Sequence, residues 1–375
     1  MTLDYEALRV IWWVLLGVLL IGFAIMDGFD MGTAIMLPWV AKTDEERRIL
    51  INAVGPTWEG NQVWFILGGG AIFAAWPSLY ALSFSGFYLA MLLVLLALIL
   101  RPVGFKYRSK MPSYRWRQFW DYALFIGGFV PALIFGVAIG NVLQGVPFHF
   151  DETLRPFYTG RFLALLNPFA LYCGLLSVLM LSMQGAQFLG IKTEAALKLR
   201  AKKWATITSL LCFVMFAFGA LFLNFSLGYQ LGDNISHVGP SNPLHKTVDL
   251  VLGAWLNNYA QYPLLWLVPA IGLAGTLLSA CCRGILGFIA SSLSIAGMIA
   301  SVGVSMFPFI LPSSSNPSQS LMVWDSSSSE TTLMIMLVAT LIFLPIILTY
   351  TAWIYRVMRG PVNAKTIAAH EESAY

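Results

Sequence analysis

Residues 12–40 read WWVLLGVLLIGFAIMDGFDMGTAIMLPWV, an apolar segment that is long enough to cross a membrane as one helix. Asp27 and Asp30 interrupt this segment three residues apart, a spacing that places both carboxylates on one helical face. An ionisable side chain at membrane depth is costly unless it faces a partner or water. The segment therefore predicts a spanning helix with a functional polar face. Gly28 and Gly32 also favour a tilt or a break beside the carboxylates.

The composition indicates an all-α polytopic membrane protein. Of 375 residues, 58% are hydrophobic and 11% are charged, whereas a soluble domain usually carries about 25% charged residues. Nine apolar segments have close to the roughly 20 residues that a bilayer requires. They lie at 10–40, 50–74, 79–100, 121–143, 163–187, 204–227, 261–282, 286–308 and 332–356. We expect one integral membrane domain over residues 1–375, with a short cytoplasmic tail at 357–375.

The basic residues predict the orientation of the chain. Eighteen of the 22 Lys and Arg residues fall at loops or segment ends on the same side. Because Lys and Arg are enriched in cytoplasmic loops, this side is expected to be the cytoplasm. Nine crossings then place the N-terminus outside and the C-terminus inside. Basic residues confined to short loops give no support to nucleic-acid binding.

The outer loops are expected at about residues 144–162, 228–260 and 309–331. The last of them is rich in Ser, which fits either an ordered lid on the outer face or a flexible tether. Ser327 and Glu330 within it have the spacing of a capping box before the final segment.

Histidine is the residue with which membrane proteins commonly hold haem. The four histidines of this chain all lie outside the apolar segments, at His149, His237, His245 and His370. The four cysteines show no metal-ligand spacing and are expected to be packing residues. We therefore expect no haem bound by the chain's own histidines and no metal site.

The carboxylates reach similar depths. Counted from the predicted inner ends at 1.5 Å per residue, Asp27, Asp30 and Glu59 lie roughly 20, 15 and 13 Å deep. Arg101, at the inner end of the third segment, is a candidate ion-pair partner. One interpretation is a proton path from the cytoplasm, in which one of two neighbouring acids holds a proton. The other is a purely structural ion-pair cluster, and the two can hold together.

The second segment contains two further features. Trp64 lies in mid-segment, where it either lines a cavity, faces a partner subunit or simply packs. The triplet at 68–70, GGG, would permit a close approach of another helix. Asp121, at the inner edge of the fourth segment, is either an interfacial residue near a helix N-terminus or a relay member.

Several motifs in collinear order carry a family resemblance. They are DGFDMG at 27–32, WEGNQVW at 58–64, RPVGFKYRSK at 101–110, GNVLQGVPF at 140–148, GAWLNN at 253–258 and WDSSSSETTL at 324–333. With them the chain closely resembles subunit II of the cytochrome bd quinol oxidases over nearly its whole length. The family motif often reads WDGNQ, so Glu59 here replaces an Asp and shifts the carboxylate by one methylene.

The resemblance implies a complex in the bacterial inner membrane that oxidises a quinol, reduces dioxygen to water and takes protons from the cytoplasm. It implies a partner, subunit I, that holds two haems b and one haem d, and one or two small single-span subunits. It also implies two four-helix bundles plus a peripheral helix, and a quinone is a candidate ligand. Asp30, Glu59 and Arg101 match positions linked to haem-site integrity or proton delivery, and Trp64 matches one linked to oxygen access.

A second function class stays open on the residues alone. Asp27, Asp30 and Glu59 would also suit a proton-coupled secondary transporter, whose sequence would show broken helices in both halves. Copurification with a haem-containing partner would distinguish the oxidase subunit from such a transporter.

Overall fold

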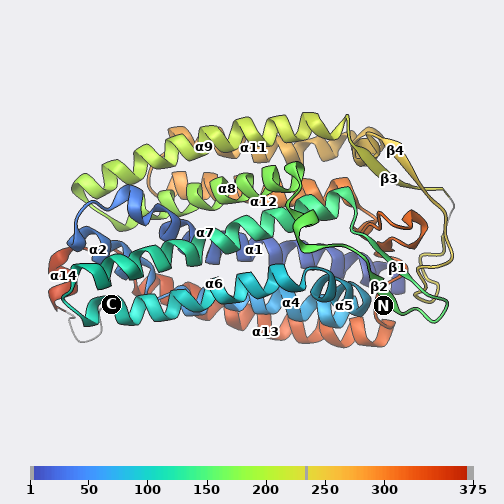
Figure 1. The fold of residues 1–375 in the computed structure, drawn as a ribbon, viewed down its shortest axis with the longest axis horizontal. Helices are drawn as coiled ribbons and strands as arrows, with labels where there is room; N and C mark the ends of the chain where they lie inside the picture. The colour runs from blue at the N-terminus through green and yellow to red at the C-terminus, as the bar shows by residue number, and fades with distance from the viewer. Residues whose placement is uncertain (1–3, 233–234, 370–375) are drawn as a thin grey trace.

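The computed structural model describes residues 4–232 and 235–369. Within these ranges, eight helices are long and apolar enough to cross a membrane, and they run along the long axis of the molecule (Figure 1). They are α1 (Tyr5–Val40), α6 (Tyr88–Tyr107), α7 (Tyr114–Gln144), α8 (Pro168–Lys192), α9 (Ala195–Leu223), α11 (Leu267–Cys281), α12 (Ile285–Met306) and α13 (Glu330–Val357). The prediction of an all-α polytopic membrane protein is confirmed.

The second predicted segment, 50–74, is not one helix. Its place is taken by α2 (Asp44–Val54), α3 (Trp58–Asn61) and α4 (Val63–Ala75), and α5 (Pro77–Gly86) follows. A turn at 55–57 separates α2 from α3, because Pro56 has no N–H to donate and its ring blocks a regular helix. The third predicted segment, 79–100, is displaced as well: Pro77 starts a separate short helix that ends at Gly86, and α6 begins only at Tyr88.

The long helices form two groups around α1. Helices α1, α4, α6 and α7 pack together, and so do α8, α9, α11 and α12, with α1 also contacting α8. Helix α13 lies beside α1 and α4 at the edge of the molecule (Figure 1). Helix α7 also packs against α8, and α1 against α12, so the predicted pair of four-helix bundles plus a peripheral helix stays a prediction. We call the end that carries α2 and α14 (Ala364–Ala369) the inner end and the opposite end the outer end; their orientation in a membrane stays a prediction.

Helix α1 is continuous over 36 residues, so the expected break beside the carboxylates is not observed. The two glycines serve helix packing instead. A Cβ at Gly32 would lie 1.9 Å from the carbonyl oxygen of Leu181, and one at Gly28 would lie 2.8 Å from a Leu181 methyl group. Gly185 of α8 meets Gly32 from the other side. The backbones of α1 and α8 can approach this closely only because no side chain separates them.

The outer end is covered by three antiparallel hairpins. Their strands are β1 (Phe148–Phe150) with β2 (Pro156–Tyr158), β3 (Leu227–Leu231) with β4 (Val248–Leu252), and β5 (Phe309–Leu311) with β6 (Leu321–Met322). Short helices complete the chain, at η1 (Arg108–Lys110), η2 (Phe162–Leu166), η3 (Ala254–Leu256), α10 (Asn257–Gln261), η4 (Pro263–Trp266) and η5 (Pro317–Gln319).

The Ser-rich loop after β6 is an ordered lid and not a tether. Trp324 and Ser326 are buried in it, and Lys246 donates a 2.5 Å hydrogen bond to the Asp325 carboxylate. Burial lowers the pKa of Lys246 and raises the pKa of Asp325, and the pairing opposes both shifts.

The predicted capping box at 327 and 330 is wrong. Ser329 caps α13, and the Ser327 hydroxyl accepts a 2.8 Å bond from the buried guanidinium of Arg9.

Candidate functional site

A buried ion pair joins α1 to α6 in the interior. The Arg101 guanidinium donates two hydrogen bonds to the Asp27 carboxylate, at 2.8 and 3.2 Å. The Arg101 side chain is 1% exposed and the Asp27 side chain is 2% exposed. Gly127 of α7 makes room for the arginine, because a Cβ there would come within 2.9 Å of its Cγ. The predicted pairing of Arg101 with an acid of α1 is therefore present, and its partner is Asp27.

Asp30, one helical turn further along α1, is held differently. Its Oδ2 accepts a 2.7 Å hydrogen bond from Asn61 Nδ2, and Asn61 Oδ1 accepts a 2.7 Å bond from the Tyr355 hydroxyl. The second carboxyl oxygen, Oδ1, has no hydrogen-bond partner within the described part of the chain. Asp30 itself is 1% exposed. We call Asp27, Asp30, Asn61, Arg101 and Tyr355 the acid cluster.

The charges of the acid cluster do not balance if both carboxyls are ionised. Two buried carboxylates would face a single guanidinium, and both terminal nitrogens of Arg101 donate to Asp27. An ionised carboxylate without a counter-charge is very unfavourable in the interior. A proton on Asp30 makes the cluster neutral. The arrangement can therefore hold one exchangeable proton beside a fixed ion pair.

The structure leaves Glu59 out of this cluster. Its side chain is exposed, and it forms no hydrogen bond or ion pair with the described residues. It lies two positions before Asn61 in α3, and Asn61 faces Asp30. Residues two apart point to nearly opposite sides of a helix. The depth of Glu59 in a membrane stays a prediction, and its carboxylate points away from Asp27 and Asp30.

A cleft of about 480 Å³ reaches Asp27 from the surface of the molecule. Its lining is apolar apart from Asp27 and Gln62, and it opens beside the exposed side chains of Ile66 and Ile99. Trp64 does not belong to this lining. The half-buried Trp64 packs over α1, where a Cβ at Gly22 would lie 2.5 Å from its ring.

The glycine triplet of α4 makes no close helix contact within this chain. A Cβ at any of the positions 68–70 would meet nothing within 4 Å. The expected close approach of another helix is therefore not observed among the described residues.

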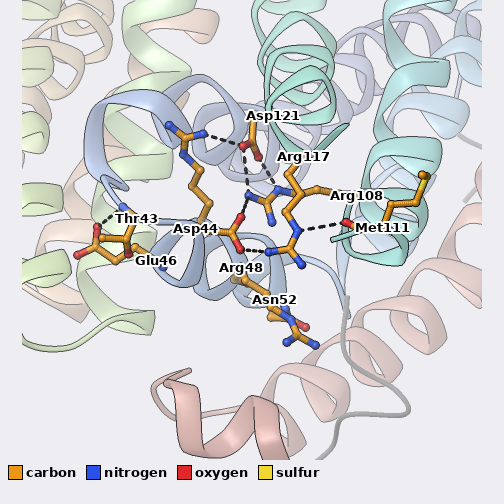
Figure 2. Close-up of polar contacts among 10 residues, drawn as sticks. Thr43, Asp44, Glu46, Arg48, Asn52, Arg108, Met111, Arg117 and Asp121 are labelled. Atoms are coloured by element: carbon orange, nitrogen blue, oxygen red, sulfur yellow. Dashed lines mark hydrogen bonds and ion pairs between the residues drawn. The ribbon is translucent and has the colours of Figure 1, made fainter. Parts of the chain in front are cut away.

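A second polar network lies at the inner end (Figure 2). Asp121 of α7 pairs with Arg47 of α2 at 2.8 Å and with Arg108 of η1 at 2.5 Å. Asp44 pairs with Arg108 at 2.8 Å and with Arg117 at 2.5 Å. Figure 2 shows the guanidinium groups of Arg108 and Arg117 beside the carboxylates of Asp44 and Asp121. The network ties the start of α2 to the loop between α6 and α7, so Asp121 is a structural ion-pair residue. Arg47 lies 74 positions from Asp121, and no local sequence pattern predicts this pair.

The described histidines lie far from the acid cluster. His149 belongs to β1, and His237 and His245 belong to the segment between β3 and β4, all at the outer end. His370 lies outside the described residues. No group of three or more His, Cys, Asp or Glu side chains that could hold a metal ion occurs in the described ranges.

Comparison with known proteins agrees over the whole chain. The family model described as cytochrome bd terminal oxidase subunit II matches residues 8–358. A probable cytochrome oxidase subunit 2 from Haemophilus influenzae is 51% identical, and the cytochrome bd-I ubiquinol oxidase subunit 2 of Escherichia coli is 48% identical. Both alignments cover 100% of this chain and 100% of the relative.

A solved structure shows the same fold. The bd oxidase from Geobacillus thermodenitrificans contains a chain that superposes with a TM-score of 0.67 at 17% identity, covering 93% of this chain and 98% of that one. On the match to the family model and the full-length relatives, the chain belongs to the family of cytochrome bd terminal oxidase subunit II.

Proposed function

We propose that this chain is the haem-free subunit of a bd-type oxidase that transfers electrons from a quinol to dioxygen, and that it gives protons access to the site of oxygen reduction. Its membership of the subunit II family and its eight apolar helices make it a multi-pass subunit of an oxidoreductase in the bacterial cytoplasmic membrane. The transporter alternative is not favoured, because the relatives are named as oxidase subunits.

The residues of this chain do not fit a haem within the membrane. The described histidines sit in β1 and in the β3–β4 connection at the outer end, away from the spanning helices. From the family resemblance we propose that two haems b and one haem d belong to subunit I, with one or two single-span subunits beside it. Quinol and dioxygen are the substrates of the complex, and lipid surrounds it. A quinone bound to this chain would suit the apolar cleft beside Asp27.

The observation that carries the proposal is the acid cluster. Asp27 and Arg101 neutralise each other, whereas Asp30 has one amide donor and one oxygen without a partner among the described residues. Asp30 is therefore the group of the cluster that can take up and release a proton. Its neighbour Asp27 lines the cleft that opens to the surface.

The exposed carboxylate of Glu59 is an argument that another protein covers the face of the molecule formed by α3 and α4. An exposed carboxylate at membrane depth is unfavourable against lipid and is stable where protein or water covers it. Glu59 is exposed on α3, and the neighbouring α4 exposes Ile66 and Phe73. The glycine triplet at 68–70 leaves room there for a further helix. We infer that subunit I covers this face and that Glu59 points towards it. The oxygen-access role of Trp64 stays a prediction.

The test compares two variants in the purified complex, Asp30→Asn and Glu59→Gln, with Glu152→Gln in an exposed outer loop as the matched control. Quinol-driven oxygen consumption is divided by the haem content of each preparation. We expect turnover per haem to fall about tenfold in both site variants, an increase of about 1.4 kcal/mol in the barrier, and to be unchanged in the control. Full turnover in an assembled Asp30→Asn complex would contradict the proton-access role.

A further inference from the structure

Tyr355 is the member of the acid cluster that no sequence motif indicates. It lies two residues before the end of α13, and its half-buried ring contacts Phe29 of α1 edge-on at 6.3 Å. Its hydroxyl donates to Asn61 Oδ1, and Asn61 Nδ2 donates in turn to Asp30. A hydrogen-bonded chain thus runs from the peripheral helix to the buried carboxyl.

This chain fixes the direction of the Asn61 amide. A phenol hydroxyl can donate to the amide oxygen, and a carboxyl oxygen can accept from the amide NH₂. While the Tyr355 hydroxyl donates and an Asp30 oxygen accepts, the amide is held with its oxygen towards Tyr355 and its NH₂ towards Asp30. An amide does not gain and lose protons in the way an acid does, so the chain is not a proton wire. Its effect on Asp30 is to hold one donor in place.

Helix α13 is otherwise loosely attached. Its buried residues are Leu333 and Leu337, both near its outer end. Tyr355 is 18 positions beyond Leu337, or about 27 Å along the axis at 1.5 Å per residue. Between these points α13 exposes large apolar side chains such as Leu341, Phe343 and Ile346. A movement of the inner half of α13 would therefore be transmitted to Asp30 through Tyr355 and Asn61.

We propose that Tyr355 is a positioning residue that sets the proton affinity of Asp30 through the amide of Asn61 and so couples α13 to the acid cluster. This inference rests on the proposed role of Asp30. The other groups that face Asp30 are Asp27 on its own helix and Arg101 from α6. Helices α7 and α8 meet this stretch of α1 through Gly128 and Gly185, which bring no titratable side chain.

The direct test is Tyr355→Phe in the complete complex. This change removes the hydroxyl and keeps the ring against Phe29. Tyr350→Phe is the matched control, because Tyr350 lies on the same helix and is exposed. We expect Tyr355→Phe to keep the haem content and to shift the pH profile of quinol oxidation by about one unit towards alkaline pH. The shift follows because a donor to the ionised carboxylate is no longer held in place.

The double variant separates this inference from the proposed function. In an Asp30→Asn background, Tyr355→Phe should cause no further shift of the pH profile. If Asp30→Asn alone leaves turnover and its pH profile unchanged, the proposed function fails. If Asp30→Asn changes them but Tyr355→Phe behaves like Tyr350→Phe, only the positioning role is overturned.

A second pair of variants applies if Asp30→Asn does not assemble. Asn61→Ser breaks the same chain at its middle and should reproduce the shift of Tyr355→Phe. The two changes together should then shift the profile no further than either one. Additive shifts would show that Tyr355 does not act through Asn61 and would overturn the inference.

Discussion

Removal of the Arg101 charge is the most demanding test of the acid cluster. In Arg101→Met the apolar stem of the side chain is largely kept, so the space beside Gly127 stays filled. The Asp27 carboxylate, however, loses both of its charged hydrogen bonds and remains buried at 2% exposure. Removing one partner of a buried ion pair costs about 3–5 kcal/mol, because the other charge is left without compensation.

The size of the effect depends on the charge left behind and not on the lost arginine. A cost of about 3–5 kcal/mol is a large part of the about 5–15 kcal/mol by which proteins are usually stable. Replacing both partners by apolar groups of similar volume is often nearly neutral. The double variant Asp27→Leu with Arg101→Met should therefore recover most of the stability lost in Arg101→Met.

Stability is measured as the thermal midpoint of the purified complex in detergent, together with haem content per complex. We expect Arg101→Met to lower both and the double variant to restore both towards the wild-type values. If the double variant is as unstable as Arg101→Met, an uncompensated Asp27 is not the cause. If Arg101→Met keeps the full midpoint and haem content, the buried ion pair does not stabilise the complex.

Two further predictions concern the inner end and the contact of α1 with α8. Burial alone would raise the pKa of Glu46, but backbone N–H groups of Lys42 and Thr43 and the Arg200 guanidinium hold it below its usual 4.5. The stability that Glu46 contributes is present above about pH 4.5 and is lost at lower pH. Below that value the thermal midpoint of the Glu46→Gln complex should therefore depend less on pH than that of the wild-type complex. Equal slopes of thermal midpoint against pH in the two complexes would contradict this. Gly32→Ala should sharply reduce the yield of assembled complex, because its Cβ would clash with Leu181. Gly17→Ala, where a Cβ meets nothing within 4 Å, should leave the yield unchanged, and normal assembly of Gly32→Ala would refute the packing argument.

Much of the architecture follows from hydropathy and charge placement. Apolar segments of membrane length give the long helices, because the bilayer fixes their length independently of what they pack against. The acids of α1 and the arginine of α6 were predicted to meet because both are costly at membrane depth without a partner. The contact of Arg101 with Asp27 confirms this reasoning.

The second crossing was not predicted correctly, because hydropathy does not report helix continuity. The segment 50–74 is apolar enough throughout, yet Pro56 interrupts it. Depth along a helix also says nothing about direction around its axis. Glu59 was predicted to lie near Asp27 and Asp30, but it turns outward because Asn61, two residues away, turns inward.

Long-range pairs are the part of the site that sequence reasoning could not reach. Tyr355 is 294 positions from Asn61, and Asp121 is 74 positions from Arg47. No local pattern links such residues, because their distance depends on how the helices are arranged. From the sequence alone, Tyr355 would be interpreted as an ordinary interfacial aromatic residue near the end of the last apolar segment.

The separation between Asp27 and Arg101 has a consequence for how the chain is made. Asp27 is synthesised 74 residues before Arg101, so the first helix must enter the bilayer with two acids and no counter-charge. Those acids are expected to carry protons, or to stay near the translocon, until the arginine arrives. The N-terminal helix thus lacks its ion-pair partner until α6 is in place, and chains truncated before residue 101 should be degraded as unassembled membrane protein.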